Sequence, residues 1–286
     1  MGMQRLLGRW DLTVGEGKDL FPSWVELTPR GGQFVGRVGS ARPIVSVEYS
    51  SDSVKFSLPP QYEGRKDDLV FQGSLRAGNL YGTTTLDDGS NAHWMGIPAP
   101  ELPSYSPSWR ETQELIGPDL SNWTLRSPDW VGNWSIEDGL LVNSAAGSDL
   151  VTVSKFGDFK LVAEYKYPPN SNSGIYLRGR YEFQILDDYE SGANGVGSSA
   201  AIYGFLAPSK NAILPPDEWN TAEITLVGRF VSVVLNGETV IDHQEIPGIT
   251  GGALDSTEGA PGPLFVQGDH GPVTFRRLSI TPGIRL

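Results

Sequence analysis

Short segments that alternate apolar and polar residues, separated by turn-forming residues, run through most of this sequence. Val54, Phe56 and Leu58 alternate with polar neighbours in one such segment. Alternation with a period of two predicts half-buried strands. Residues 30–32 and 87–89 are two of the intervening turn signals, because glycine and aspartate tolerate positive φ or close tight turns. The pattern therefore predicts an all-β protein.

Turn-forming residues are abundant and thiols are absent. The 286 residues include 35 glycines and 21 prolines, no cysteine and three histidines. This glycine and proline content points away from a helical protein, while an apolar share of 38% is enough to build a core. Without cysteine, disulfide scaffolds, thiolate zinc sites and cysteine nucleophiles are excluded.

The charge balance narrows the range of partners. Lysine and arginine total 22 against 34 aspartates and glutamates, which gives a net charge of −12. A chain this acidic without a basic stripe is a poor match for a phosphate backbone, so we expect no nucleic acid partner. No apolar run approaches the roughly 20 residues that span a bilayer, so we expect no membrane partner.

A proline-rich stretch divides the chain. Residues 97–107 contain four prolines, and proline removes backbone donors and stiffens a linker. We predict a domain boundary near residue 108. Residues 1–108 carry the hairpin signals of a small antiparallel β-barrel-like meander. Residues 109–286 carry further strand signals and the turn Asn236-Gly237, and they suit a two-sheet β-sandwich.

The most informative segment is the predicted strand at residues 181–187. Side chains alternate between faces along a strand, so Glu182 and Gln184 share one face and the apolar residues between them face the core. Asp187 falls at the strand end, where a bulge or turn could bring it beside them. Such a flat, rigid face with directional hydrogen-bonding groups suits a sugar. The structural alternative is a polar solvent-facing surface on an outer strand.

Hydrogen-bonding residues recur on the neighbouring segments. Arg178 ends the strand before residue 181, and Tyr203 lies in a later polar-aromatic strand. Gln267 and His270 belong to a glycine-rich loop, and Arg276 follows in the last predicted strand. We predict a catalytic role for the histidine and substrate binding for the other four.

Eight short segments occur in the order seen in one known family. They are Asn172-Ser-Gly-Ile, Tyr181-Glu-Phe-Gln-Ile-Leu-Asp187, Ala201-Ile-Tyr-Gly204, Trp219-Asn220, Leu235-Asn-Gly237, Gly262-Pro-Leu-Phe-Val-Gln267, His270-Gly271 and Val273-Thr-Phe-Arg276. Through them, residues 112–282 resemble the 3-keto-disaccharide hydrolase domain family. The chain departs from the common pattern at residues 275–277, where an asparagine often follows the first arginine, and at residues 267–270.

The resemblance has implications for fold, activity and location. It implies a concanavalin A-like jelly-roll sandwich and an enzyme that cleaves an oligosaccharide or another glycoside. Members are usually exported, so we expect a periplasmic or extracellular protein, although the chain begins without a signal peptide. Residues 1–108 fall outside the resemblance.

Two mechanisms are compatible with the candidate residues. In a retaining hydrolase, Glu182 attacks the anomeric carbon and Asp187 protonates the leaving oxygen. On a 3-keto-glycoside, which the resemblance favours, a base removes the C2 proton and the C1 substituent leaves by elimination. Glu182 or His270 would be that base, and Asp187 or Tyr203 the acid.

The elimination route also needs a positive charge at the enolate oxygen. Arg178, Arg276 or a divalent metal could supply that charge, and Gln184 would orient a hydroxyl or the ketone. Asp187 and Asp188 could bind calcium together with nearby carbonyls, but no EF-hand spacing occurs. We therefore assign no cofactor and keep a divalent metal such as calcium as an alternative.

Other functions remain open from the sequence. The same groups could hold a glycan without chemistry, as in a non-catalytic carbohydrate-binding module. The chain could also be an interaction protein in which the barrel is the functional partner. A homo-oligomer is compatible with either function.

Overall fold

The computed structural model describes residues 3–284. Apart from the 3-10 turns Met3–Arg5 and Gly17–Asp19, its regular elements in that range are all β-strands, which confirms the all-β prediction. Neither turn has the length or apolar character that a membrane-crossing helix needs.

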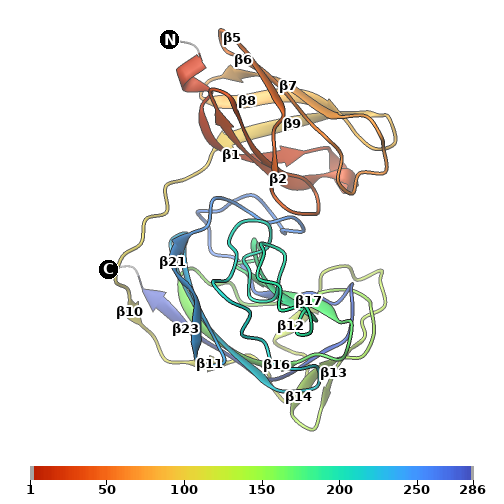
Figure 1. Cartoon of the computed structure of the whole chain (residues 1–286), viewed down its shortest axis with the longest axis vertical. Coiled ribbons are helices and arrows are strands. Elements are labelled where there is room, and N and C mark those ends of the chain that lie inside the picture. The colour runs from red at the N-terminus through yellow and green to blue at the C-terminus, as the bar shows by residue number, and fades with distance from the viewer. Residues whose placement is uncertain (1–2, 285–286) are drawn as a thin grey trace. The chain divides into compact units, whose positions relative to one another are not determined.

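The contacts of the chain divide it into two units (Figure 1). Unit 1 comprises Met1–Glu101 and Gly248–Gly259, and unit 2 comprises Leu102–Pro247 and Ala260–Leu286. The division after Glu101 falls inside the proline-rich stretch. The sequence placed Gly248–Gly259 in the second domain, whereas its contacts lie with the first.

Unit 1 is one nine-stranded antiparallel meander. Its strand order is β4-β3-β2-β1-β9-β8-β7-β6-β5, so every two paired strands are consecutive in the chain except β1 and β9. The strands are β1 (Gly8–Val14), β2 (Phe21–Thr28), β3 (Gly31–Val35), β4 (Arg42–Pro43), β5 (Ser46–Ser50), β6 (Ser53–Leu58), β7 (Leu69–Arg76), β8 (Asn79–Thr85) and β9 (Asn91–Pro98).

The meander curls on itself around an aromatic core. The ring centroid of Phe34 on β3 lies 6.0 Å from that of Phe56 on β6 and 4.8 Å from that of Phe71 on β7. The hydroxyl of Tyr49 on β5 donates to the carbonyl of Thr28 on β2 at 2.7 Å. These contacts join strands that are distant in the sheet order, as in a small barrel.

Two glycines make room for one tryptophan in this core. Gly73 on β7 lies opposite Gly82 on β8, and Gly82 lies opposite Trp94 on β9. A Cβ at either glycine would overlap the indole of Trp94, and at Gly82 it would also overlap the carbonyl of Gln72. The indole N–H donates to the Thr83 carbonyl at 3.1 Å. The ring therefore lies flat against adjacent strands that carry no side chain beneath it.

The segment Gly248–Gly259 packs against the outside of the barrel strands in unit 1. Gly248 contacts the indole of Trp24, which is fully buried, and Gly251 contacts the backbone of residues 38–39. Neither position has space for a Cβ. Because this segment links two strands of unit 2, the chain passes between the units three times.

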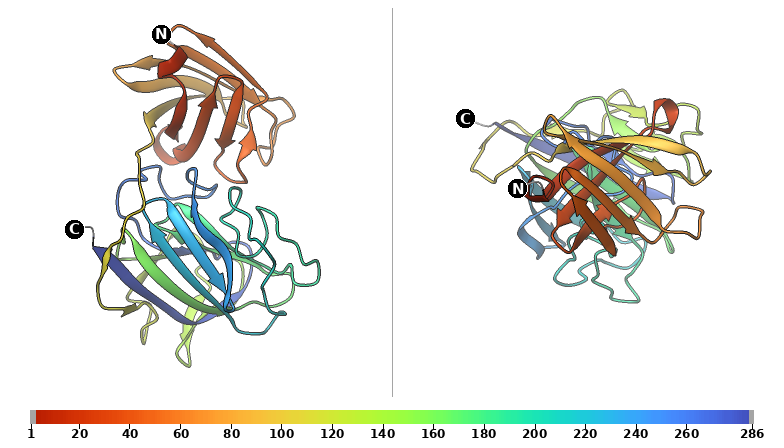
Figure 2. Two further views of the ribbon diagram at one scale, coloured as in Figure 1. Left: turned by 60° about the vertical axis from the view of Figure 1, so that its left-hand side comes forward. Right: turned by 90° about the horizontal axis from the view of Figure 1, so that it is seen from above.

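Unit 2 is a β-sandwich of two antiparallel sheets. The larger sheet has the order β13-β14-β23-β16-β19-β20-β21, with β10 and β11 also paired to β23; the left view of Figure 2 shows its strands side by side. The smaller sheet has the order β12-β15-β22-β17-β18.

The bounds of the unit 2 strands are as follows: β10 (Ser108–Trp109), β11 (Gln113–Glu114), β12 (Trp123–Leu125), β13 (Trp134–Glu137), β14 (Leu140–Asn143), β15 (Leu150–Thr152), β16 (Phe159–Lys166), β17 (Asn172–Leu177), β18 (Tyr181–Leu186), β19 (Asn220–Val227), β20 (Phe230–Leu235), β21 (Glu238–Glu245), β22 (Phe265–Val266) and β23 (Val273–Ile284).

Aromatic rings join the two sheets of the sandwich. Phe183 on β18 meets Tyr165 on β16 edge to face at 6.4 Å, and Tyr165 packs against Phe275 on β23 at 6.2 Å. The predicted hairpin turn is present between β20 and β21, where Asn236 and Gly237 have φ values of 52° and 81°. Positive φ at both central residues is characteristic of a type I′ turn.

Substituting Gly82 with alanine should destabilise unit 1 by roughly 1–3 kcal/mol, because the new methyl group has to displace the Trp94 indole or a paired strand. Urea unfolding monitored by tryptophan fluorescence would measure this change. Gly64→Ala is the matched control, since Gly64 has no positive φ and no atom within 4 Å of its added Cβ. Equal stability of the two variants would contradict the packing role of Gly82.

Candidate active site

Strand pairing aligns polar and aromatic side chains across the smaller sheet. Glu182 on β18 pairs with Tyr176 on β17, and Tyr176 pairs with Phe265 on β22. Directly opposed residues point to the same face, so these three form one row. Phe183, on the alternate face, contacts Tyr165 of the larger sheet. The row therefore lies on the face turned away from the sandwich core.

A second row on the same face lies two residues along each strand. Gln184 pairs with Gly174, and the backbone N–H of Gln267 donates to the Gly174 carbonyl at 2.9 Å. β15 pairs with β22, and the position next to this pairing places Asp149 opposite Gln267, in the same row. A Cβ at Gly174 would lie 2.7 Å from Oε1 of Glu182, so the glycine leaves the space that the carboxyl group occupies.

Residues 200–203 extend the smaller sheet beyond β18. Ile202 forms a β-bridge with Phe183, and the Tyr203 N–H donates to the Glu182 carbonyl at 2.9 Å. This register places Tyr203 beside Glu182 and on the same face. Tyr203 therefore lies beside Glu182, among the candidate site residues.

Glu182 is a buried carboxyl group with hydrogen-bond donors at both oxygens. Its exposed fraction is 4%, and the Tyr176 hydroxyl donates to Oε2 at 2.8 Å. The amide nitrogen of Gln184 donates to the Ser173 carbonyl at 2.9 Å and to Oε1 of Glu182 at 3.3 Å. Burial raises the pKa of Glu182 to about 8, against the opposing effects of Tyr176 and His270. The carboxyl group is therefore protonated at neutral pH.

An aromatic pair and an ion pair lie beside this carboxyl group. The Tyr176 and Phe265 rings stack with centroids 3.8 Å apart, and the Arg126 guanidinium lies 5.2 Å from the Phe265 centroid. Arg126 also donates to Oδ2 of Asp149 at 3.1 Å, and the Gly268 N–H donates to Oδ1 at 2.9 Å. Burial raises the pKa of Asp149, although both donors oppose the shift.

His270 is paired with its sequence neighbour in the loop between β22 and β23. Its Nδ1 lies 2.5 Å from Oδ1 of Asp269. This hydrogen bond is the main cause of a raised His270 pKa; burial opposes the shift, and the nearby charges of Asp269 and Asp149 add to it. A neutral His270 that donates from Nδ1 keeps Nε2 available as a proton acceptor.

Asp187 lies apart from this cluster. Its Oδ2 accepts the N–H of Asn170 at 2.7 Å, just beyond the end of β18. Five residues of strand separate its Cα from that of Glu182 by about 16 Å, and the alternation turns it to the other face. A retaining pair requires carboxyl groups about 5–5.5 Å apart. The geometry therefore does not provide the Glu182–Asp187 pair of the retaining mechanism.

Arg178 has structural contacts instead of a place in the cluster. It is buried in the turn between β17 and β18, where it donates to the Gly228 carbonyl and lies 3.9 Å from Oδ1 of Asp158. Its guanidinium also stacks 5.2 Å from the Tyr181 ring centroid. These partners hold Arg178 at the hairpin end of the sheet.

Arg276 belongs to the larger sheet. It lies on β23, donates to Oε2 of Glu164 at 2.5 Å and stacks over Trp219 at 4.7 Å. Its contacts are therefore with the sheet opposite the one that carries Glu182.

The Asp188 carboxylate, considered above for calcium, accepts the Ser199 N–H at 2.8 Å and the Asn211 amide at 3.0 Å. Within residues 3–284, no group of three or more histidine, aspartate or glutamate side chains is placed to hold a metal ion.

The sequence did not predict site roles for Arg126, Asp149, Tyr176 and Asp269. The alternation rule placed no strand at residues 150–152, because that strand is three residues long. Tyr176 directly follows the segment Asn172-Ser-Gly-Ile, and its face follows only from the register with β18 and β22. Asp149 and Arg126 each lie directly beside a short strand, which is the one local signal that could have identified them.

Comparison with known proteins identifies similar domains. Residues 111–281 match the model of the 3-keto-alpha-glucoside-1,2-lyase-like domain. A crystal structure from Parabacteroides distasonis, named as a putative glycosyl hydrolase, is 27% identical with a TM-score of 0.50 and covers 62% of this chain and 92% of its own. A second protein of that name and organism is 25% identical with a TM-score of 0.47, covering 60% and 98%. No curated protein matches the chain.

Replacing Glu182 with glutamine should change how stability depends on pH. The folded protein keeps a proton on Glu182 up to about pH 8, whereas an unfolded glutamate loses it near pH 4.3. The wild type should therefore lose stability as pH rises through this window, by up to about 1.4 kcal/mol per unit from this group. The variant lacks this loss, so its stability relative to wild type should increase from pH 5 to pH 8.

Urea unfolding at several pH values would measure this difference. Glu223→Gln is the matched control, because Glu223 is an exposed glutamate of the same unit. Titrating groups that do not interact with Glu182 are common to both proteins and cancel. A stability difference that does not vary with pH would contradict the buried, protonated state of Glu182.

Proposed function

The chain belongs to the 3-keto-alpha-glucoside-1,2-lyase-like domain family, and we propose that its sandwich unit cleaves 3-keto-glycosides at the cluster around Glu182. Family membership and the similar structures support a glycosyl hydrolase-like, carbohydrate-active protein. The proposal of 3-keto-glycoside cleavage rests on one observation. Glu182 is a buried, protonated carboxyl group that interacts electrostatically with His270, and the Asp269 carboxylate orients His270. Such a pair supplies one acid and one base at the same pH.

In the first step, the pair carries out an elimination. The C3 ketone acidifies the hydrogen at C2, and Nε2 of His270 removes it as a proton. The electrons of the C2–H bond form a C1–C2 double bond while the C1–O bond breaks. Glu182 gives its proton to the departing oxygen, so that the aglycone leaves as an alcohol.

Water then restores the catalyst. As water adds to C1, the Glu182 carboxylate accepts one of its protons, and the His270 imidazolium returns a proton to C2. The products are a 3-keto sugar and the released alcohol, which together equal substrate plus water. Each residue ends the cycle in the protonation state in which it began.

Neighbouring side chains have supporting roles in this proposal. Arg126 replaces Arg178 and Arg276 as the cation for the enolate oxygen at C3, because it is the arginine that neighbours the Phe265 ring and Asp149. Gln184 and Tyr176 orient the Glu182 carboxyl group. Asp269 orients His270 and stabilises its charged form, so it is a positioning residue.

Leaving-group dependence tests the two roles separately. On a 3-keto-glucoside with an alkyl aglycone, Glu182→Gln and His270→Asn should each lower kcat by roughly 10²–10⁴-fold. On the 4-nitrophenyl glycoside, whose leaving group needs no proton, Glu182→Gln should recover most of its rate and His270→Asn should not. Release of the aglycone measures both.

Glu223→Gln and His243→Asn are the matched controls, at exposed positions of the larger sheet. Equal loss on both substrates for Glu182→Gln would remove it from the acid role. Sugar binding without turnover by the wild-type protein would favour the carbohydrate-binding module over the enzyme.

The pH profile of kcat/KM should be bell-shaped. The acidic limb reports the His270 base, whose pKa lies above its ordinary value, and the alkaline limb reports Glu182 with a pKa of about 8. Asp269→Asn removes the main cause of the histidine shift and should move the acidic limb to lower pH while the alkaline limb stays above neutral. An acidic limb that does not move would contradict the role of Asp269.

A further inference from the structure

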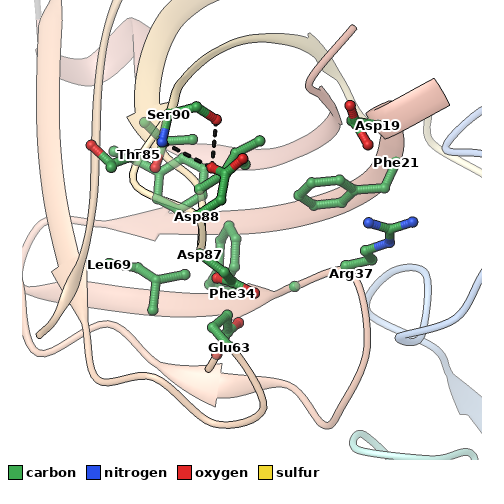
Figure 3. A pocket seen from close by; sticks show the side chains of 14 residues that line it. Asp19, Phe21, Phe34, Arg37, Glu63, Leu69, Thr85, Asp87, Asp88 and Ser90 are labelled. Atoms are coloured by element: carbon green, nitrogen blue, oxygen red, sulfur yellow. Dashed lines mark hydrogen bonds between the residues drawn. The ribbon is translucent and has the colours of Figure 1, made fainter. Parts of the chain in front are cut away.

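Unit 1 contains a pocket of its own. A pocket of about 250 Å³ opens at one end of the barrel, and Figure 3 shows the side chains that line it. Its apolar lining is formed by Phe21, Phe34, Leu69, Phe71 and Leu86. All lining residues belong to unit 1, so the pocket is distinct from the cluster around Glu182.

The pocket floor is part of the barrel core. Phe34 and Phe71 are buried members of the core cluster, with ring centroids 4.8 Å apart. Further in, Phe56 stacks on Phe71 at 5.1 Å. The pocket thus ends on a rigid aromatic base, which suits the apolar body of a small molecule.

The rim of the pocket is predominantly negative. Asp19, Asp87 and Asp88 line it together with Arg37, and Arg65 donates to the carbonyl of the lining residue Thr85. Asp88 accepts the backbone N–H and the hydroxyl of Ser90 at 2.9 and 2.6 Å, the bonds dashed in Figure 3. Glu63 also lines the pocket, but it is paired with a neighbouring arginine.

The aromatic rings of the lining already have cations over their faces. The Arg37 guanidinium lies 5.7 Å from the Phe21 centroid, and the Arg42 guanidinium lies 5.9 Å from the Phe34 centroid. Arg42 is neutralised by its pair with Glu63. Arg37 is exposed to solvent. Cation–π attraction and the acidic rim therefore favour the same sign of ligand charge.

We propose that this pocket binds a small organic cation with an aromatic or alkyl body, its ammonium group at Asp87 and Asp88 and its apolar body on the phenylalanine floor. The two halves of such a ligand match the two halves of the pocket. A neutral ligand of equal shape loses the rim attraction, and an anion meets three carboxylates against the two arginines Arg37 and Arg65. This binding is independent of the sugar chemistry of unit 2.

Matched probes of different charge test the proposal on the full chain. Phenethylammonium, 2-phenylethanol and 3-phenylpropionate share a phenyl body and carry a positive, zero and negative charge. Titration by ligand-observed NMR at low salt should rank them in that order of affinity. The double substitution Asp87→Asn and Asp88→Asn should weaken the binding of phenethylammonium by about tenfold, the upper end for two exposed charges, and leave the binding of the alcohol unchanged.

Two further variants locate the binding site. Leu86→Trp fills the pocket and should abolish binding of all three probes, whereas Asp138→Asn, at an exposed turn of unit 2, should change none of them. Thermal unfolding confirms that each variant is folded. Equal affinity for the cation and the alcohol, tightest binding of the anion, binding that persists in a folded Leu86→Trp protein, or no binding of any probe would each overturn the proposal.

Discussion

The hydrogen-bonded register of β17 with its two neighbours, β18 and β22, determines what the smaller sheet can do. That register brings Glu182, Tyr176 and Phe265 into one row although they come from three separate strands. A shift of one residue would turn Glu182 toward the sandwich core, where Phe183 now packs. Gly174 completes the arrangement, because any side chain there would occupy the position of the Glu182 carboxyl group.

Burial of that carboxyl group has opposite consequences for stability and for chemistry. Removing Glu182 from water raises its pKa to about 8, and the ionised form is therefore disfavoured in the folded protein. The fold gives up stability as pH rises from about 4.3 to 8, and it retains a proton donor at neutral pH. The neighbouring charges of Asp149 and Asp269 act in the same direction on Glu182. Strongly shifted groups gather at functional sites for this reason.

Local patterns in the sequence were enough to predict the strands, but they were not enough to predict which residues meet at the site. Alternation predicted β18 and the shared face of Glu182 and Gln184, and Asn236-Gly237 predicted its hairpin turn, since both depend on adjacent residues. The place of Asp149 depends on the pairing of β15 with β22, more than a hundred residues away. Asp187 does not neighbour Glu182, because β18 stays extended to its end and the Asp187 carboxylate accepts the N–H of Asn170 there. Register between distant strands is tertiary information that a single sequence does not display.

The segment Gly248–Gly259 changes what removal of the N-terminal unit would mean. This segment lies on the chain between β21 and β22, and β22 carries Phe265. Its glycines pack against Trp24 and the backbone of residues 38–39, so truncation before residue 102 would leave the segment without the surface that fixes it. Lost activity in such a truncation would follow from a displaced loop even if unit 1 had no part in the chemistry. Point substitutions at the unit 1 pocket leave this packing in place, and they separate a binding role of the barrel from its role as a support.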